Sequence, residues 1–164
     1  MNVSAPWPVA VFAHNEARNI VACLDSLQAA SAVPPACYVL ANACTDATES
    51  RVRDYARTHP NVHLVSIVVG DKANAWNVFV HEAAPAGQPV YFFMDGDVRA
   101  TPGALDVMAC ALEGEPHANG VSALPMSGRG VEAFRRDMLR DRGVAGNLYG
   151  LRGAFAERLR ARGI

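Results

Sequence analysis

The chain of 164 residues is long enough to form one domain with its own hydrophobic core. About half of its residues are apolar, but its longest apolar runs have the length of strands, which excludes a transmembrane helix. The formal net charge of −1 gives no reason to expect nucleic-acid binding.

Two local features of the sequence suggest where the protein works. The first residues lack both the basic start and the apolar stretch of an export signal, so we expect a cytoplasmic location. Residues 129–164 hold nine Arg against four acidic residues. Such a basic segment suits an anionic or lipid-linked partner, the inner membrane face or the remainder of a longer protein, and a solvated helical face explains it at least as well.

The cysteines show no metal-binding or redox spacing. There is no C-x-x-C pair and no His at ligand spacing, so we expect reduced and mostly buried thiols rather than a zinc site. The four residues are Cys23, Cys37, Cys44 and Cys110.

Strands and helices are predicted to alternate along the chain. The apolar runs that predict strands are 9–13, 38–41, 62–68 and 90–94, with a fifth strand at 118–124. Run 90–94 is wholly apolar and aromatic, as expected of a strand that is covered on both faces. Helices are predicted after the first four strands and at 131–142 and 154–162, with a glycine-containing joint at 143–153.

Polar residues are predicted to begin these helices. Asn15 is a candidate N-cap of the first helix, and Asp46 with Glu49 is a candidate capping box for the second. Asp71 is a candidate N-cap of the third helix. Thr101 followed by Pro102 predicts a fourth helix from residue 103 to 112.

Repeated strand–helix units predict the α/β class, with a mainly parallel, Rossmann-like sheet and helices on both faces. Ligands of such sheets bind at the carboxyl ends of the strands. Four polar clusters follow predicted strands: 14–16, 42–46, 71–72 and 95–97. We therefore expect them to converge on one site.

The cluster Asp95-Gly96-Asp97 carries the strongest chemical signal. Residues two apart in an extended segment point the same way, so both carboxylates can face one space, and Gly96 leaves room for a ligand. One or two carboxylates together with phosphate oxygens are the usual ligands of Mg²⁺, and Mn²⁺ takes similar oxygen ligands. A plain polar turn is the alternative interpretation.

The other three loops have both functional and structural interpretations. His14 offers a flat ring for a base to stack on, although a single loop histidine is more often solvated or structural. Residues 42–46 offer amide and hydroxyl groups, or else form an N-cap turn. Lys72, the one lysine of the chain, could reach a phosphate or a carboxylate at a neighbouring strand end.

Several nucleotide-binding and hydrolytic classes lack their signatures. There is no G-x-x-x-x-G-K-[ST] phosphate loop and no G-x-G-x-x-G after the first strand, which disfavours ATPases and dinucleotide enzymes. Neither G-x-S-x-G nor H-E-x-x-H occurs, so hydrolase chemistry lacks a nucleophile and a zinc site.

In this order and spacing the four clusters resemble glycosyltransferase family 2, whose fold is of the GT-A type. The matching segments are V-F-A-H-N-E-A-R-N-I at 11–20 with C-L-D-S-L at 23–27, A-N-A-C-T-D-A-T at 41–48, G-D-K-A-N-A-W-N at 70–77, and M-D-G-D at 94–97 with Pro102 and Leu105. His14 replaces the usual tyrosine of a Y-N-E motif, and 95–97 resembles the family's D-x-D motif.

The resemblance implies a role for each matching position. It implies that the nucleotide pocket is lined by Ala13, His14, Glu16, Asn42, Asp46, Lys72 and Asp95. Asp95 would face the ribose or diphosphate, and Asp97 would bind the metal, Mg²⁺ or Mn²⁺, with Asp95 beside it. Ala41 stands where family members often have an aspartate that recognises the base, so the resemblance leaves the identity of the base open. UDP-sugar is the default expectation for the donor.

The resemblance also divides the chain. We expect a nucleotide-sugar-binding core at 1–128 and a basic helical segment at 129–164 that leads toward an acceptor-binding half, since 146–152 (G-N-L-Y-G-L-R) resembles the stretch before that half. The family's acidic catalytic base is expected beyond residue 164. Glu157 lies on a predicted helix without an acidic neighbour.

The resulting functional hypothesis is an inverting, metal-dependent transfer of a sugar from a nucleoside-diphosphate sugar to an acceptor hydroxyl. Two alternatives stay open at this point. One is a non-catalytic binding or scaffold module, suggested by Ala41 and the missing base. The other is a nucleotidyltransferase, which would carry a Gly-rich first loop with Arg and Lys that 14–16 does not supply.

Overall fold

The computed structural model describes residues 6–128, 130–141, 144 and 146–163. Its strands are β1 (Pro8–Ala13), β2 (Ala36–Asn42), β3 (Val62–Ile67), β4 (Val90–Asp95), β5 (Gly120–Ser122) and β6 (Leu148–Arg152). They form one six-stranded sheet in the order β3-β2-β1-β4-β6-β5. The pairs among β1, β2, β3 and β4 are parallel, whereas β6 is antiparallel to β4 and β5. The predicted α/β class and mainly parallel sheet are confirmed.

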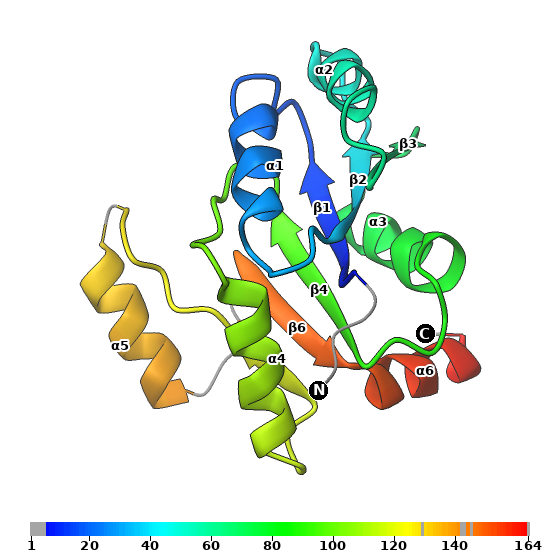
Figure 1. Ribbon diagram of the computed structural model, residues 1–164. Coiled ribbons are helices and arrows are strands. Elements are labelled where there is room, and N and C mark those ends of the chain that lie inside the picture. Colours follow the sequence, from blue (N-terminus) through cyan, green and yellow to red (C-terminus); the bar gives the residue numbers. More distant parts are fainter. Residues whose placement is uncertain (1–5, 129, 142–143, 145, 164) are drawn as a thin grey trace.

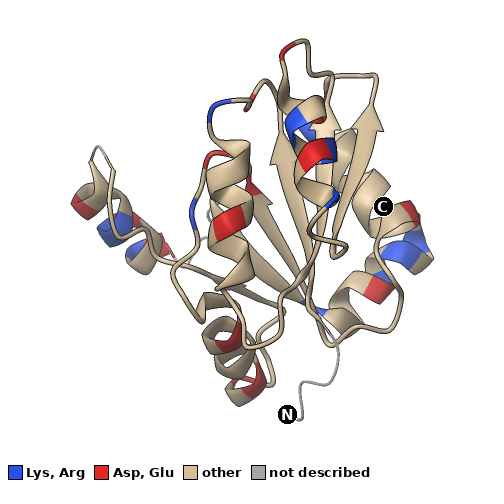
Figure 2. Cartoon of the chain, turned by 45° about the horizontal axis from the view of Figure 1, so that its top comes forward, with Lys and Arg blue, Asp and Glu red and all other residues tan. Residues whose placement is uncertain are grey.

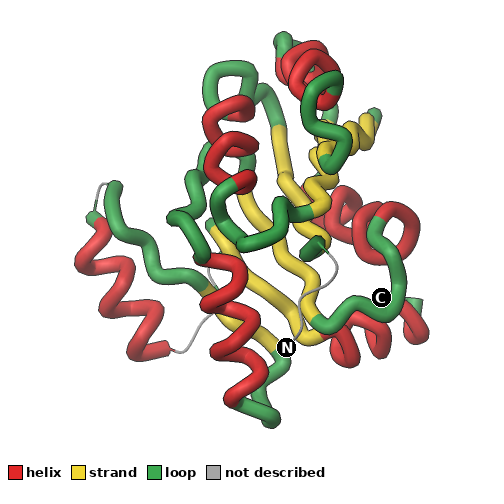
Figure 3. Tube along the Cα trace, viewed as in Figure 1, coloured by secondary structure: helices red, strands yellow, loops and turns green. Residues whose placement is uncertain are grey.

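Helices cover both faces of the sheet (Figure 1). They are α1 (Ile20–Gln28), α2 (Thr48–Ala56), α3 (Lys72–Val78) with a π-helical turn η1 (Phe79–Ala83), α4 (Ala104–Gly114), α5 (Val131–Asp141) and α6 (Gly153–Arg162). Helices α1, α2 and α4 pack on one face, and α3, η1 and α6 pack on the other. Helix α5 has no buried residue and stands apart from the sheet in Figure 3. Among the described residues, no helix combines the length and apolar content needed to cross a bilayer.

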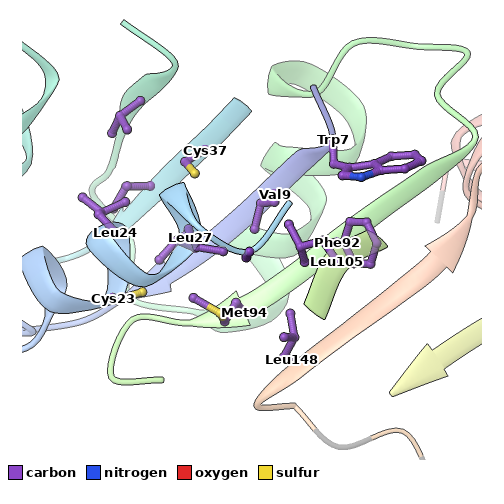
Figure 4. Packing of buried hydrophobic residues seen from close by; sticks show 14 of the residues in the cluster. Trp7, Val9, Cys23, Leu24, Leu27, Cys37, Phe92, Met94, Leu105 and Leu148 are labelled. Atoms are coloured by element: carbon purple, nitrogen blue, oxygen red, sulfur yellow. The ribbon is translucent and has the colours of Figure 1, made fainter. Parts of the chain in front are cut away.

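Strand β4 lies in the middle of the core, as its aromatic sequence predicts. Phe92 faces α4 and meets the Trp7 ring edge-on at a centroid distance of 5.9 Å (Figure 4). Phe93 faces the opposite side and stacks on Tyr149 of β6 at 4.8 Å. Both Phe side chains are fully buried, and burial of one such side chain stabilises the fold by roughly 1.5–3 kcal/mol. The strand that carries the D-x-D segment is therefore firmly fixed.

The main error of sequence-based prediction is β6. Residues 143–153 were predicted as a joint between two helices, but 148–152 form a strand that inserts between β4 and β5. Residues 143 and 145 of the joint lie outside the described residues. Gly150 permits the insertion, because a Cβ there would lie 2.9 Å from Cε1 of Phe92. The predicted fifth strand is shorter than expected, since β5 holds only Gly120–Ser122.

Three of the predicted helix starts differ from the structure. The amide oxygen of Asn15 accepts hydrogen bonds from the second loop rather than from α1. Helix α4 begins after Gly103 in a left-handed conformation, φ 72°, so Thr101 and Pro102 lie in the preceding turn. Asp46 does accept from the Thr48 amide at the start of α2, but Glu49 pairs with Arg53 one helical turn later instead of closing a capping box. Asp71 is confirmed as the N-cap of α3, where its carboxylate accepts from the Ala73 amide at 2.8 Å.

Cysteine burial follows the prediction only in part. All four thiols are free, and Cys23 and Cys37 are buried in the core. Burial is the largest cause of the raised pKa of both thiols. Cys44 is half-buried and Cys110 is exposed, because Cys110 lies on the outer face of α4.

Part of the arginine excess in residues 129–164 is used inside the fold. The Arg152 guanidinium donates to the carbonyls of Leu112, Glu115 and Ala118. Arg160 donates to the carbonyls of Val80 and Ala84. Figure 2 shows acidic residues interspersed with the basic ones on α5 and α6. These contacts weaken the expectation of a uniformly basic surface.

Glu157 fixes α6 against the end of η1 and the start of β4. Its Oε1 accepts hydrogen bonds from the Gly87 amide at 3.0 Å, the Tyr91 hydroxyl at 2.8 Å and Arg160 Nη1 at 2.9 Å. The Gly87 hydrogen bond, followed by that of Tyr91, lowers the pKa of Glu157 below its ordinary value. This carboxylate therefore has a structural role and lines neither cavity described below.

A Glu157→Gln variant should be less stable than the wild-type chain near neutral pH, by about 1 kcal/mol because the site is partly exposed. A lowered folded-state pKa means that the ionised form stabilises the fold above the unfolded-state pKa and that this contribution is lost as pH falls. The difference between the two proteins should therefore shrink below about pH 4.5. Urea unfolding across pH tests this, with exposed Glu113→Gln as the control; a pH-independent difference would contradict the ionic role.

Candidate functional site

The carboxyl ends of β1, β2 and β4 enclose a cavity of about 250 Å³. Its lining combines three loops of the parallel sheet with the first residue of α3. The lining residues are Phe12, Ala13, His14, Glu16, Asn42, Lys72, Asp95, Gly96 and Asp97. Every predicted site residue lines this cavity except Asp46, which lies outside the lining. Phe12 was not predicted as a site residue, although its position at the end of β1 signals it.

Lys72 and Asp95 form an ion pair across the cavity. Lys72 Nζ lies 2.5 Å from Asp95 Oδ1 and 5.3 Å from the centre of the Phe12 ring. Asp95 is the last residue of β4, and its backbone amide donates to the Asn147 carbonyl at 3.2 Å. The sequence suggested either a phosphate or a carboxylate as the partner of Lys72. In the structure its partner is the carboxylate of Asp95.

Gly96 allows the chain to turn tightly against the end of β1. Its amide donates to the Phe12 carbonyl at 2.7 Å, and a Cβ at this position would lie 3.0 Å from that oxygen. After this turn Asp97 is exposed and makes no hydrogen bond or ion pair with any described residue. Residues 95–97 therefore form a turn, which was the alternative interpretation of the sequence. The same turn places Asp97 in the lining of the cavity.

The first two loops are held together by Asn15 and Asp46. Asn15 Oδ1 accepts from the Thr45 amide at 2.8 Å, and Asp46 Oδ2 accepts from the Ala17 amide at 3.0 Å. Asp46 Oδ1 also accepts from the hydroxyl and amide of Thr48, the first residue of α2. The Thr48 hydroxyl is the largest cause of the lowered pKa of Asp46. Asp46 therefore fixes the loops around the cavity without lining the cavity itself.

His14 ties the first loop to the second, and Asn42 ties the second loop to the third. His14 Nδ1 lies 2.7 Å from the Asn42 carbonyl oxygen, so this nitrogen carries the proton and donates. Asn42 Oδ1 accepts from the Asp71 amide at 3.1 Å, which positions the start of α3 and thus Lys72. Ala41, directly before it, is fully buried between Ala13 and Ser66 of the neighbouring strands.

A second, larger cavity of about 560 Å³ adjoins the first and shares Asp97 with it. Its walls come from 97–101 and 104, from 123–128, and from 147–148. The lining is largely apolar, with Leu124 and Met126 exposed, and Arg99 adds a positive charge. Sequence patterns did not find this groove, because the insertion of β6 brings its walls together.

The residues present fit a divalent metal that shares its ligands with a phosphate group. Among the described residues, no cluster of three or more His, Cys, Asp or Glu could hold a metal alone. Asp95 and Asp97 border an open cavity, and two carboxylates plus phosphate oxygens are sufficient for Mg²⁺ or Mn²⁺. A metal here would take its remaining ligands from phosphate oxygens or from water.

Residues 9–160 match the family model described as glycosyl transferase family 2. The chain belongs to this family, and its sheet with flanking helices is the GT-A fold. A comparison with curated protein sequences finds no match.

Solved structures of glycosyltransferases share this fold. A mannosyltransferase from Pyrobaculum calidifontis in complex with GDP-Man and Mn²⁺ is 24% identical, with a TM-score of 0.70 over 96% of this chain and 50% of that one. TarS of S. aureus is 19% identical, with a TM-score of 0.70 over 94% and 49%. Glucosyl-3-phosphoglycerate synthase from Mycobacterium tuberculosis, in complex with Mn²⁺, UDP and phosphoglyceric acid, is 21% identical, with a TM-score of 0.64 over 93% and 57%. The chain thus spans about half the length of these proteins.

Proposed function

We propose that the chain binds a nucleoside-diphosphate sugar, together with Mg²⁺ or Mn²⁺, for transfer of the sugar to an acceptor hydroxyl. The observation that carries this proposal is the convergence of Lys72, Asp95 and Asp97 on one cavity at the carboxyl ends of β1, β2 and β4. The family match and the Mn²⁺ and nucleotide complexes of two structural relatives support it.

The nucleotide part of the donor and the metal have proposed partners. The nucleoside lies among Ala13, His14, Glu16 and Asn42, and Asp46 holds these loops in place. Lys72 binds the diphosphate, Asp95 the ribose or diphosphate, and Asp95 with Asp97 the metal. UDP-sugar remains the default donor. When bound, the metal would stabilise the negative charge on the departing diphosphate.

The acceptor side of the proposal rests on the larger groove next to Asp97. Its apolar residues, among them Leu124 and Met126, suit a lipid-linked acceptor, and Arg99 suits an anionic one. Inversion at the sugar carbon, a cytoplasmic location and association with the inner membrane face are further parts of the proposal. So is the division into a donor-binding core at 1–128 and a segment at 129–164 that leads toward the acceptor. We assign no residue of this chain as the catalytic base.

Calorimetric titration of the chain with UDP and with GDP, each with and without Mn²⁺, tests the proposal. We expect Mn²⁺ to raise the affinity for at least one diphosphate by about 10-fold or more, as is typical of coupled ligands. UMP and GMP are the matched controls, because they lack the second phosphate. Equal binding of mono- and diphosphates, or no metal effect on any nucleotide, would contradict the proposed site.

One observation favours a second candidate function, a binding module without turnover. Ala41 places a buried methyl group where family members often have a base-recognising aspartate. Such a module would bind the diphosphate and metal as above but would not release free sugar or transfer it. Incubation with UDP-sugars and GDP-sugars, followed by chromatography of the released nucleotide, tests this candidate: release of the nucleotide would rule out a module without turnover.

A further inference from the structure

The single lysine of the chain is paired with a proposed metal ligand. Lys72 Nζ and Asp95 Oδ1 are 2.5 Å apart, and the two side chains are 57% and 29% exposed. The ammonium therefore lies where a cation bound to Asp95 would also lie. Two positive charges cannot share one carboxylate oxygen closely without strong repulsion.

Lys72 can leave this position without disturbing the fold. It is the first residue of α3, which Asp71 caps, and its ammonium is carried on a flexible four-carbon stem. Gly146 lies beside the ion pair and adds no side chain there: a Cβ built on it would lie 3.8 Å from Lys72 Nζ and 3.9 Å from Asp95 Oδ2. A half-exposed ion pair is also weak enough to exchange for another partner.

We propose that Lys72 is a built-in counterion of Asp95 that moves to the diphosphate when the nucleotide binds, and thereby makes metal binding depend on the nucleotide. The inference rests on the proposed donor site and deepens it. Without a nucleotide, Lys72 neutralises Asp95 and disfavours a metal. With a diphosphate present, the ammonium gains a more highly charged partner and Asp95 becomes free.

This exchange couples the two ligands. Whatever the nucleotide contributes to metal affinity, the metal must contribute equally to nucleotide affinity. The benefit is that the carboxylates do not hold a metal before the donor arrives. It follows that removing the lysine charge must shift the two separate affinities in opposite directions.

Lys72→Met tests this exchange, because Met keeps the length and the apolar stem but lacks the charge. The probes are Mn²⁺ alone, followed by electron paramagnetic resonance of the free ion, and UDP or GDP without metal, followed by calorimetry. We expect Mn²⁺ alone to bind about 10-fold more tightly to the variant and the metal-free diphosphate about 10-fold more weakly. Lys72→Arg should leave Mn²⁺ binding as weak as in the wild type, because it keeps the charge.

The matched control is Arg18→Met, which removes an exposed cation of the first loop that has no partner among the described residues. It should change neither affinity by more than about 2-fold, since Arg18 does not line the cavity and its exposed charge is weakened by solvent and salt. Unchanged or weaker Mn²⁺ binding to Lys72→Met, with the nucleotide still bound by the wild type, would overturn the exchange. If the wild-type chain shows no metal-dependent diphosphate binding, the proposed function itself fails instead.

Discussion

Replacing Asp97 with Asn should remove the effect of Mn²⁺ on nucleotide binding and leave the fold intact. Asp97 is exposed and makes no hydrogen bond or ion pair with the described residues, so the variant loses no contact of the folded state. The other carboxylate, Asp95, is already paired with Lys72. Asp97 is thus the carboxylate that is free to receive the metal first.

The size of the effect follows from the small number of protein ligands. Loss of a residue that only supports a metal ligand costs about 10–100-fold in metal affinity, so loss of one of two direct ligands should cost at least about 100-fold. The metal-free affinity for UDP or GDP should stay the same or rise slightly, because one negative charge next to the diphosphate is removed. Calorimetry with and without Mn²⁺ measures both quantities.

Asp54→Asn is the matched control for Asp97→Asn. Asp54 is an exposed residue of α2, and its contact with Arg57 at 3.6 Å is too long and too exposed to stabilise the fold measurably. Its replacement should leave both the metal effect and the stability unchanged. If Asp97→Asn retains the full Mn²⁺ effect, the metal does not bind at the D-x-D segment.

Sequence patterns sufficed for the parallel half of the fold because each unit there is local. Where a strand of four to seven residues is followed by an amphipathic helix, the spacing of the apolar residues along the sequence changes clearly. Parallel strands also place their carboxyl ends at one edge of the sheet. The site residues of the first four loops could therefore be grouped before their contacts were known. Lys72 and Asp95 are 23 positions apart, yet both follow strands of the same sheet.

The antiparallel part could not be predicted in the same way. Strand β6 has only five residues, three of them half-buried and one a glycine, so its own pattern is as weak as that of a loop. Its place is set by long-range pairing with β4 and by the fit of Gly150 under Phe92. The larger groove, which depends on β6, was missed for the same reason.

Local hydrogen-bond competition explains the wrong helix starts. Asn15 has the side chain of an N-cap, but in the left-handed conformation, φ 56°, it reaches across to the second loop instead. Such a choice between a local and a distant partner cannot be read from a sequence window. The outcome bears on the proposed function, since the same contact holds together the two loops that are proposed to bind the nucleoside.

Replacing Gly153 with Ala should destabilise the fold by about 3 kcal/mol, at the upper end for overpacking a well-filled site. A Cβ at this position would lie 1.7 Å from the Gln88 carbonyl oxygen and 3.1 Å from that of Pro89. Both clashing atoms belong to the backbone, so no change of rotamer can relieve the contact. The Gly153 amide also donates to the Pro89 carbonyl at 2.8 Å, which keeps the two segments close.

The destabilisation should be concentrated where β6 passes into α6. Relief of the clash requires α6 to move away from the start of β4, which would break the Glu157 contacts to Gly87 and Tyr91.

Gly114→Ala is the matched control for Gly153→Ala. Gly114 lies in the last turn of α4 with no atom near its Cβ position, and Ala there should stabilise the fold by roughly 0.5–1 kcal/mol. Urea unfolding of both variants should give shifts of opposite sign, and equal stability of Gly153→Ala and the wild type would refute the close packing. Because β6 forms one wall of the larger groove, a destabilised junction should also loosen that groove. The cavity proposed for the donor, which is built on β1, β2 and β4, should keep whatever affinity for UDP or GDP the wild type has.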